Sequence, residues 1–366
     1  MTATPPGPTQ RVTIKPQWSI RVGDDGAMLA PRVVELLVKI DEQGSLSSVC
    51  QAQGLSYRHA WELIRQGEAV FGEPLVRMER GKGSQLTALG EKLVWADRRI
   101  NARLSPVLDT LASELDAEIE KVLSPARTML RIHANHGFAV ETLRPWLERS
   151  GVHSEFKYCG SIEAVAALNG GACDVAGFPV PIGEFEPAVV EHYRRWFAPG
   201  QRIVNVATRR QGLMVAPGNP LKIYELKDLA RPGVRFINRQ PGSGTRLLLD
   251  LLLRRDGIEP GRINGYEQCE LTHAAVAAYV ASGMADAGYG VETPARQFKL
   301  DFLPSQVERY FFLCHEASLA SPPVMALVDV LRSPEYRAEV NRLAGYEADE
   351  SGRVMTLDEA FETLRG

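Results

Sequence analysis

One short run of the sequence combines glycines, hydroxyl side chains and an arginine in an order that suits anion binding. The run is Asn238–Arg246, and it joins a predicted strand to a predicted helix. The first backbone N–H groups of a helix have no partner within the helix, and the helix dipole adds positive potential there. Ser243, Gly244 and Thr245 supply N–H and hydroxyl donors, and Arg246 supplies a fixed positive charge. The run therefore predicts a binding site for a small anion.

Three further places in the same half of the chain have polar residues at the start of a predicted helix. They supply the remaining candidate ligand-binding residues, which are Asn135, His136, Ser161, Thr272 and His273. In α/β domains, ligands bind outside the carboxyl ends of parallel strands, where such helices begin. We therefore expect the four helix starts to converge on one cleft between two lobes.

The motifs of catalysis and of metal binding are missing from the sequence. Its histidines occur without a Gly-x-Ser-x-Gly or His-Glu-x-x-His motif, and no nucleotide-binding glycine motif is present. The five cysteines are scattered and odd in number, which argues against disulfides and against a zinc site. We expect a protein that is not an enzyme, with no metal and no covalent cofactor, whose only small ligand is the anion.

The N-terminal part of the chain predicts two short helices joined by a tight turn. Ser45 and Ser56 are placed to cap these helices, and Gly54 is placed to end the first one in a left-handed conformation. This spacing is typical of a helix-turn-helix, whose second helix sets its N-terminal residues against base edges in the major groove of DNA. A hairpin over 74–86 follows as a wing. The candidate DNA-binding residues are Ser56, Tyr57, Arg58, His59 and Arg65 on the helix and Arg77, Arg80 and Lys82 on the wing.

The charge of the whole chain gives no hint of nucleic acid, because the net charge is −3 at pH 7. Within 54–103, nine Lys and Arg residues stand against six Asp and Glu residues. This local excess of positive charge is modest, and phosphate contacts supply most non-specific affinity for DNA. We therefore expect binding to double-stranded DNA to need two copies of the chain, as a homodimer or a tetramer.

Further elements are expected around this motif. Alternating apolar residues predict a strand or short hairpin over 11–28, and a buried face predicts a helix over 31–41. A long helix begins after Thr87, with apolar residues every three or four positions from Leu89 to Val122. Such a stripe is typical of a helix that packs against its own copy. We expect Pro106 to kink or interrupt this helix.

The length and composition indicate a multidomain globular protein. The chain has 366 residues, with 45% hydrophobic and 24% charged residues. Beyond residue 128 short apolar strands alternate with helices, which predicts an α/β fold. We expect a disordered tail over 1–10, an α+β winged helix-turn-helix domain over 11–87, a linker and dimerisation helix over 88–123, and a two-lobed α/β effector-binding domain over 128–366. Neither a membrane-spanning apolar run nor a signal peptide is apparent, so we expect a cytoplasmic protein that does not associate with membranes.

Two stretches of the N-terminal part resemble a known family. They are Gly54–Trp61, with its Leu-Ser-Tyr-x-x-Ala-Trp pattern, and Arg80–Gly90, with its Leu-Thr-x-x-Gly pattern. Together with Ile40–Leu46 they resemble the DNA-binding domain of the molybdate-sensing regulators, and they are similar to that of the LysR-type regulators. The resemblance covers roughly residues 16–122 and implies a winged helix-turn-helix that binds DNA.

The C-terminal part resembles a second family. The runs Gly242–Arg246, Thr272–Val276 and Ala285–Gly290 resemble the type 2 periplasmic-binding-protein fold, in particular that of the periplasmic molybdate-binding protein. The resemblance covers about residues 128–345 and implies a substrate-binding domain for an oxyanion such as molybdate or tungstate. The periplasmic relatives hold oxyanions chiefly with neutral donors, whereas Arg246, His136 and His273 stand at the matching helix starts here. This departure leaves room for a small carboxylate such as formate.

These features lead to one interpretation with one alternative. We interpret the chain as a sequence-specific DNA-binding transcription regulator that is controlled by a small anion bound between the lobes of its C-terminal domain. The alternative is a DNA-binding regulator whose C-terminal domain is a ligand-independent scaffold or a partner-binding module. Binding of small anions separates the two.

Overall fold

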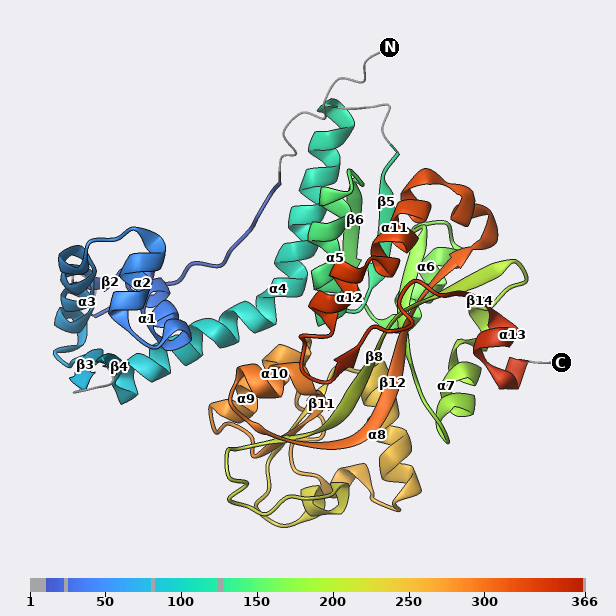
Figure 1. The fold of residues 1–366 in the computed structure, drawn as a ribbon. Coiled ribbons are helices and arrows are strands. Elements are labelled where there is room, and N and C mark those ends of the chain that lie inside the picture. The colour runs from blue at the N-terminus through green and yellow to red at the C-terminus, as the bar shows by residue number, and fades with distance from the viewer. Residues whose placement is uncertain (1–10, 23–25, 80–82, 124–127, 365–366) are drawn as a thin grey trace. The chain divides into compact units, whose positions relative to one another are not determined.

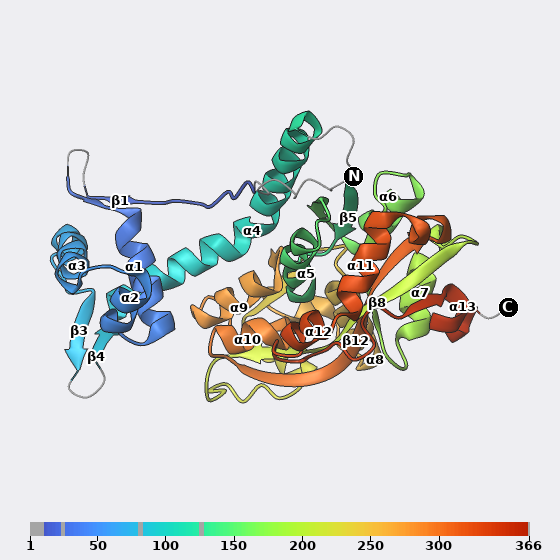
Figure 2. The ribbon, with the colours of Figure 1, turned by 45° about the horizontal axis from the view of Figure 1, so that its top comes forward.

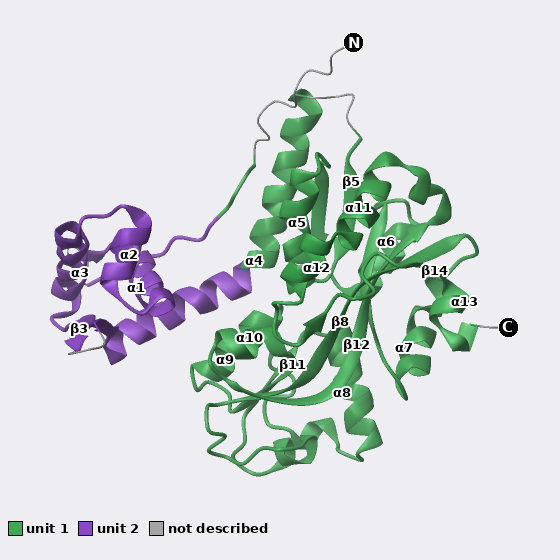
Figure 3. Cartoon of the chain, viewed as in Figure 1, with its two compact units in different colours: residues 1–14, 105–366 green, residues 15–104 purple. Residues whose placement is uncertain are grey.

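The computed structural model describes residues 11–22, 26–79, 83–123 and 128–364. These residues form two compact units (Figure 3). The N-terminal unit comprises residues 15–104, and the C-terminal unit comprises the chain from residue 105 onward together with the stretch that ends at Ile14. The helix α4 (Ala88–Leu123) begins in the first unit and ends in the second. Among the described residues, no helix is both long enough and apolar enough to cross a membrane.

The N-terminal unit is built from three helices and a hairpin. These are α1 (Pro31–Gln43), α2 (Leu46–Gln53), α3 (Tyr57–Phe71), β3 (Val76–Glu79) and β4 (Gly83–Leu86). The caps lie where the sequence predicts them. Ser45 Oγ accepts a hydrogen bond from Ser48 N, Ser56 Oγ accepts one from His59 N, and Gly54 ends α2 with a left-handed φ of 65°. Because these residues fix both ends of the turn, the angle between α2 and α3 is set locally.

The expected strand or hairpin over 11–28 is only partly present. Two short strands, β1 (Ile20–Arg21) and β2 (Met28–Leu29), pair antiparallel, and residues 11–19 form no strand. The side chains of this stretch bond to a helix instead, since Trp18 Nε1 donates to Asp97 Oδ1 of α4 at 2.9 Å. An alternating apolar pattern predicts a strand only where another strand is available to pair with it.

The apolar stripe of α4 divides between two environments. Leu93 and Val94 are buried in the core of the N-terminal unit, where α1, α2 and α3 also pack. The expectation that the whole stripe from Leu89 faces another copy is therefore wrong for its first turns. The later stripe residues are exposed: Val107, Leu111, Leu115, Ile119 and Val122. The helix continues through Pro106 without interruption.

The C-terminal unit contains two lobes with the same order of elements. The first lobe has β5 (Leu130–Ala134), α5 (Phe138–Arg149), β6 (Ser154–Tyr158), α6 (Ser161–Asn169) and β7 (Val175–Pro181). The second has β9 (Phe236–Arg239), α8 (Gly244–Arg255), β10 (Cys269–Glu270), α9 (His273–Ala281) and β11 (Ala287–Val291). The strands of each lobe are parallel, in the orders β6-β5-β7 and β10-β9-β11. The expected two-lobed α/β architecture is thus confirmed (Figure 1).

An arginine–aspartate pair recurs at the same place in both lobes. Arg131, in β5, donates from its backbone N to Asp174 Oδ2 at 2.8 Å and from Nη2 to Asp174 Oδ1 at 2.8 Å. Arg235, just before β9, makes the same two bonds to Asp286, at 2.8 and 2.6 Å. Asp174 stands directly before β7, and Asp286 stands directly before β11. Each pair therefore ties the first strand of its lobe to the third. The two lobes therefore share local chemistry as well as topology.

Two long strands join the lobes. β8 (Gln201–Val215) and β12 (Asp301–His315) pair antiparallel along their whole length. One end of β8 pairs with β11 of the second lobe, and β12 pairs with β7 of the first, so all these strands form one sheet. Figures 1 and 2 show the two strands running from one lobe to the other. The middle of this pair is the covalent and hydrogen-bonded connection between the lobes.

The remaining elements cover the sheet. They are α7 (Glu186–Tyr193), α10 (Glu292–Gln297), α11 (Pro322–Arg332), α12 (Pro334–Val340), β13 (Tyr346–Glu347), β14 (Val354–Thr356) and α13 (Leu357–Ala360). The helices α11 and α12 pack with α5 around the first lobe's core, and β13 and β14 pair with β8.

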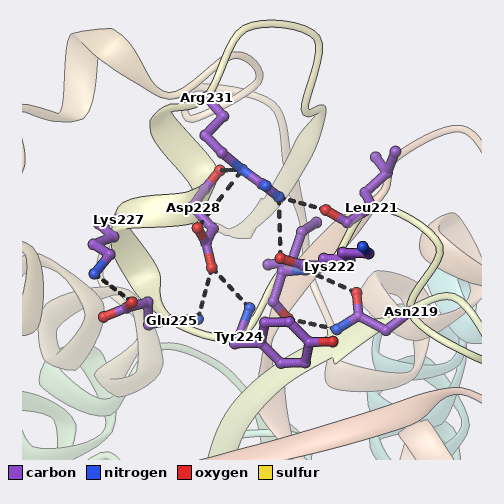
Figure 4. A network of polar contacts seen from close by, with 9 residues as sticks. Asn219, Leu221, Lys222, Tyr224, Glu225, Lys227, Asp228 and Arg231 are labelled. Carbon is purple, nitrogen blue, oxygen red and sulfur yellow. Dashed lines mark hydrogen bonds and ion pairs between the residues drawn. The ribbon is translucent and has the colours of Figure 1, made fainter.

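The connection after β8 holds itself together by polar contacts (Figure 4). Asp228 Oδ2 accepts hydrogen bonds from the backbone N of Tyr224 and of Glu225, at 2.8 and 3.2 Å. Arg231 Nη2 donates to the carbonyl oxygen of Leu221 at 2.6 Å. These bonds satisfy backbone polar groups locally, and they surround the short 3-10 helix over Leu226–Ala230 that lies in this connection.

The second half of α4 covers an exposed sheet edge of the first lobe. β6 is the last strand of the sheet, and its outer N–H groups have no neighbouring strand. Ser113 Oγ accepts from Phe156 N at 2.7 Å, and Thr110 Oγ1 accepts from Tyr158 N at 3.1 Å. An uncovered edge invites pairing with other chains, so α4 protects the strand while it docks on the lobe.

We predict that Ser113→Ala lowers the free energy of unfolding of the C-terminal unit by about 1–3 kcal/mol, because the buried N–H of Phe156 loses its acceptor. Urea denaturation followed by circular dichroism measures this change. Glu114→Ala is the matched control, since Glu114 is exposed one residue further along α4 and helix propensity changes little. Equal stability of the two variants would contradict the capping role of Ser113.

Candidate functional site

A pocket of about 370 Å³ opens in the C-terminal unit where the four predicted helix starts meet. Its lining takes residues from each strand-to-helix connection of both lobes, and from α4. The lining residues of these connections are Asn135, His136, Cys159, Gly160, Glu163, Arg239, Gln240 and Leu271. The strands β5, β6, β9 and β10 end at the pocket, as the rule for α/β folds predicts.

Arg239 is the distinctive cation of this pocket. It is the last residue of β9 and only 3% exposed. Its Nη2 donates to the carbonyl oxygen of Leu271 at 2.9 Å, while Nε and Nη1 are buried without a hydrogen-bond partner. Burial and the neighbouring Arg209 lower the pKa of Arg239. A buried charge with unsatisfied donors is costly, and a bound anion would remove that cost.

The nearby carboxylate of Glu308 is already occupied by other partners. Arg209, in β8, stands opposite Glu308, in β12, and its Nε donates to Glu308 Oε1 at 2.5 Å. Gln211 Nε2 donates to the same oxygen at 2.7 Å and to Thr245 Oγ1 at 3.0 Å. Burial disfavours the charge on Arg209, but Glu308 outweighs that effect and raises the pKa of Arg209. This buried network lies in the middle of the strands that join the lobes.

His273 begins α9 and is buried as a neutral ring. Burial, and after it the charges of Arg239 and Arg209, hold the pKa of His273 well below its usual value. Its Nδ1 accepts from the backbone N of Val291 at 3.4 Å. In a neutral ring with an accepting Nδ1, the proton resides on Nε2, which makes that atom a hydrogen-bond donor.

His136 connects the pocket to α4. Its Nδ1 lies 2.9 Å from Glu141 Oε1 of α5, and its Nε2 lies 3.6 Å from Asp109 Oδ2 of α4. Burial alone would lower the pKa of His136, but these two carboxylates outweigh it and raise the pKa to about 9. The imidazolium therefore persists at neutral pH and joins the first lobe to the long helix.

Neutral donors and acceptors complete the first lobe's side. Ser161 Oγ donates to Asn135 Oδ1 at 2.7 Å, and Asn135 Nδ2 donates to the carbonyl oxygen of Cys159 at 3.0 Å. The backbone N of Asn135 donates to Tyr310 Oη at 3.1 Å. These bonds hold the β5–α5 and β6–α6 connections together, so the polar groups at this wall are oriented in advance.

The anion-binding role expected for Arg246 is not supported by its position. Its guanidinium lies over the ring of Tyr266 at 3.9 Å, pairs with Asp250 at 3.3 Å and donates to the carbonyl oxygen of Tyr266 at 3.2 Å. These partners belong to its own lobe, and Arg246 lines a separate pocket of about 290 Å³ together with Ser243 and Gly244. The pocket where the four connections meet is lined by Arg239 and not by Arg246.

The hydroxyl residues at the second lobe's helix starts act as caps or bridges. Ser243 Oγ accepts from Arg246 N at 3.2 Å, and Thr272 Oγ1 accepts from Ala275 N at 2.9 Å. Thr245 Oγ1 accepts the hydrogen bond from Gln211 Nε2 described above. Among the described residues, no group of three or more His, Cys, Asp or Glu side chains is placed to hold a metal ion.

The candidate DNA-binding residues that the structure describes are all exposed. Ser56, Tyr57, His59 and Arg65 are exposed, and the side chain of Arg58 is 91% exposed. Arg58 forms an ion pair with Glu62 one turn later, at 3.2 Å, and on the hairpin Arg77 pairs with Glu79 at 3.0 Å.

Two wing residues predicted from the sequence, Arg80 and Lys82, lie outside the described residues. Of the others, Ser56 caps α3, Arg77 lies in β3, and the rest belong to α3. Those on α3 are Tyr57, Arg58, His59 and Arg65.

Comparisons with known proteins identify the superfamily to which the C-terminal unit is similar. A model of the PBP superfamily domain matches residues 144–332, which is more than half of the chain. Three relatives are similar in sequence. YvgK of Bacillus subtilis, an uncharacterised protein, is 33% identical over 204 residues, which cover 54% of this chain and 64% of that protein. An uncharacterised Clostridium pasteurianum protein encoded 5′ of a ferredoxin gene is 37% identical over 111 residues, covering 30% of this chain and 98% of its own length.

The third relative is the molybdenum-pterin-binding protein MopB of Rhodobacter capsulatus, 31% identical over 102 residues, or 27% of this chain and 38% of MopB. The chain thus spans about two thirds of YvgK and less of MopB. Among solved structures, the LysR family transcriptional regulator CbnR aligns with a TM-score of 0.38 and 18% identity over 82% of this chain and 99% of CbnR. On the match over residues 144–332, the chain belongs to the PBP superfamily.

Proposed function

We propose that this protein is a DNA-binding transcription regulator of the cytoplasm, controlled by an anion that binds between the lobes of the C-terminal unit. One observation carries the ligand part of this proposal. Arg239 is a buried guanidinium with two unsatisfied nitrogens, and it lines a pocket on which all four strand-to-helix connections converge. Asn135 lines the same pocket as a neutral group, and His273 lies close enough for Arg239 to lower its pKa.

Two classes of anion suit such a site. A tetrahedral oxyanion such as molybdate or tungstate is favoured by the name of MopB, and a carboxylate is favoured by the fork of donors that a guanidinium presents. The same pocket serves both classes, since either anion would occupy the free donors of Arg239.

The N-terminal unit carries the DNA part of the proposal. Its α2 and α3 are joined by a tight capped turn, α3 presents exposed polar residues at its N-terminus, and a hairpin follows. This order of elements fits a winged helix-turn-helix, in which the first turn of the second helix contacts base edges.

A route between the two sites runs through α4. His136 lines the pocket and pairs with Asp109 of α4, which begins in the N-terminal unit. A ligand that moves the first lobe's wall thereby acts on the helix that leaves the DNA-binding part. A coupling of only 1–3 kcal/mol, roughly, is enough for regulation.

We predict that Arg239→Gln weakens anion binding at least tenfold, because the only buried guanidinium with free donors in this pocket is removed. Isothermal titration calorimetry with formate, molybdate, tungstate and sulfate measures the affinity. Arg246→Gln is predicted to change it much less, and Arg254→Gln, an exposed arginine of the same lobe, is the surface control. Binding that survives in Arg239→Gln but not in Arg246→Gln would restore the assignment made from the sequence. No binding of any anion to the wild-type protein would favour the scaffold alternative.

We predict that Arg58→Ala weakens binding to a specific DNA site by roughly 1–3 kcal/mol if Arg58 contacts a base edge. Fluorescence anisotropy with a labelled duplex selected from a random pool measures this loss. Glu62→Ala is the matched control, since it removes the ion-pair partner of Arg58 without removing its charge. Affinity that is unchanged in Arg58→Ala, with circular dichroism like that of the wild type, would remove Arg58 from the DNA interface.

We predict that Leu115→Glu and Ile119→Glu on α4 reduce self-association, because these exposed apolar side chains repeat every four residues on one face of the helix. Size-exclusion chromatography with light scattering measures the oligomeric state. Leu221→Glu is the control, since it places the same charge on an exposed loop. A wild-type oligomer in both α4 variants would show that another surface makes the assembly.

A further inference from the structure

The ligand pocket has an apolar wall in addition to its cationic floor. On one side it is lined by Arg239 and the polar groups of the strand ends, and on the other by Pro106, Val107, Thr110 and Leu111 of α4. Tyr158 and Leu271 add further carbon surface. The linker helix is therefore a wall of the pocket as well as a neighbour of the lobe.

The apolar side chains at this wall are only half covered. Val107 is 49% exposed, Leu111 47% and Leu271 45%. Each of them belongs to the lining of the same pocket as Arg239. An apolar surface that adjoins a buried cation with free donors is complementary to a molecule with one anionic end and one apolar end.

We propose that the ligand is an organic monocarboxylate whose carboxylate pairs with Arg239 and whose hydrocarbon body lies against Val107 and Leu111 of α4. This inference rests on the proposed function and specifies the ligand of the same pocket. It also makes α4 a direct ligand contact, so the helix senses the body of the molecule rather than only a movement of the lobe.

The size of the pocket favours this class over a bare oxyanion. A volume of about 370 Å³ falls in the range of sites that enclose organic molecules. An inorganic anion at Arg239 gains nothing from the carbon surface of α4 and leaves it facing water.

The carboxylates near the pocket are paired with cations of the protein. Glu163 lines the pocket, and its carboxylate pairs with Lys157 at 3.3 Å. Asp109 of α4 pairs with His136, which also lines the pocket. Arg239, by contrast, keeps two buried nitrogens without a hydrogen-bond partner, and two such donors match the two oxygens of one carboxylate.

The test is a chain-length series measured by isothermal titration calorimetry on the full chain. Formate, acetate, butyrate, hexanoate and benzoate are compared with molybdate, tungstate and sulfate. Each methylene that leaves water for the wall is expected to tighten binding about fourfold until the pocket is full. Hexanoate or benzoate should therefore bind at least tenfold tighter than formate.

A pair of variants assigns this gain to α4. Leu111→Asn is expected to weaken hexanoate binding about tenfold and to leave formate binding unchanged, because formate does not reach the wall. Leu221→Asn is the control, since Leu221 has a similar exposure on a loop of the second lobe that is not part of this pocket. Variants of Leu111 that bind hexanoate like the wild type would overturn the contact with α4.

The outcomes separate this inference from the proposed function. Tight binding of molybdate or tungstate that depends on Arg239, with no gain along the carboxylate series, would keep the anion-controlled regulator and overturn the organic ligand. The absence of binding for every compound in both sets would overturn both.

Discussion

The C-terminal unit is organised around positive charges that are buried between two lobes. Arg209 lies close enough to Arg239 to lower its pKa, and Glu308 is committed to Arg209 and Gln211. Removing charges from water costs several kcal/mol per ion unless close partners compensate. For Arg209 of β8 the compensating partner is Glu308, which stands opposite it in the paired strand β12. Arg239 keeps two donors without partners, so the protein alone does not complete the site.

The helix α4 has three tasks that depend on different faces of its length. Leu93 and Val94 complete the core of the N-terminal unit, Ser113 and Thr110 satisfy the edge of β6, and Val107 and Leu111 line the pocket. The residues that make these three kinds of contact therefore all belong to one helix. Under the proposed function, this shared helix is the route by which a ligand at Arg239 would influence the N-terminal unit.

The sequence predicts best those features that depend on neighbours along the chain. The caps at Ser45 and Ser56 and the strand-to-helix connections of both lobes follow from local rules. The position of the buried guanidinium is less local. The strand β9 ends at Arg239, inside the run Asn238–Arg246 that the sequence assigns to the connection between strand and helix. Arg246 has the expected spacing from the glycines, but Asp250, four residues later on α8, and Tyr266, from a segment after the helix, already engage its guanidinium.

Other features could not be read from one sequence because they join distant segments. Arg209 and Glu308 carry no motif and become partners only through the register of β8 and β12. The apolar stripe on α4 shows a similar limit. Its apolar residues recur every three or four positions both near Leu93, which is buried in a core, and near Leu115, which is exposed. Periodicity identifies an apolar face, and only the tertiary structure shows what covers it.

The equal topology of the lobes makes the difference between their chemistry informative. At matching strand ends, the first lobe offers the amide of Asn135 and the hydroxyl of Ser161, while the second offers the guanidinium of Arg239 and the ring of His273. Charge binds an anion at long range, whereas neutral donors contribute only at hydrogen-bond distance. Under the proposed function, the guanidinium of Arg239 would supply long-range attraction from the second lobe, and the imidazolium of His136 would add to it from the first. Because His136 also pairs with Asp109 of α4, an anion in this pocket would act on the same charges that hold α4 to the first lobe.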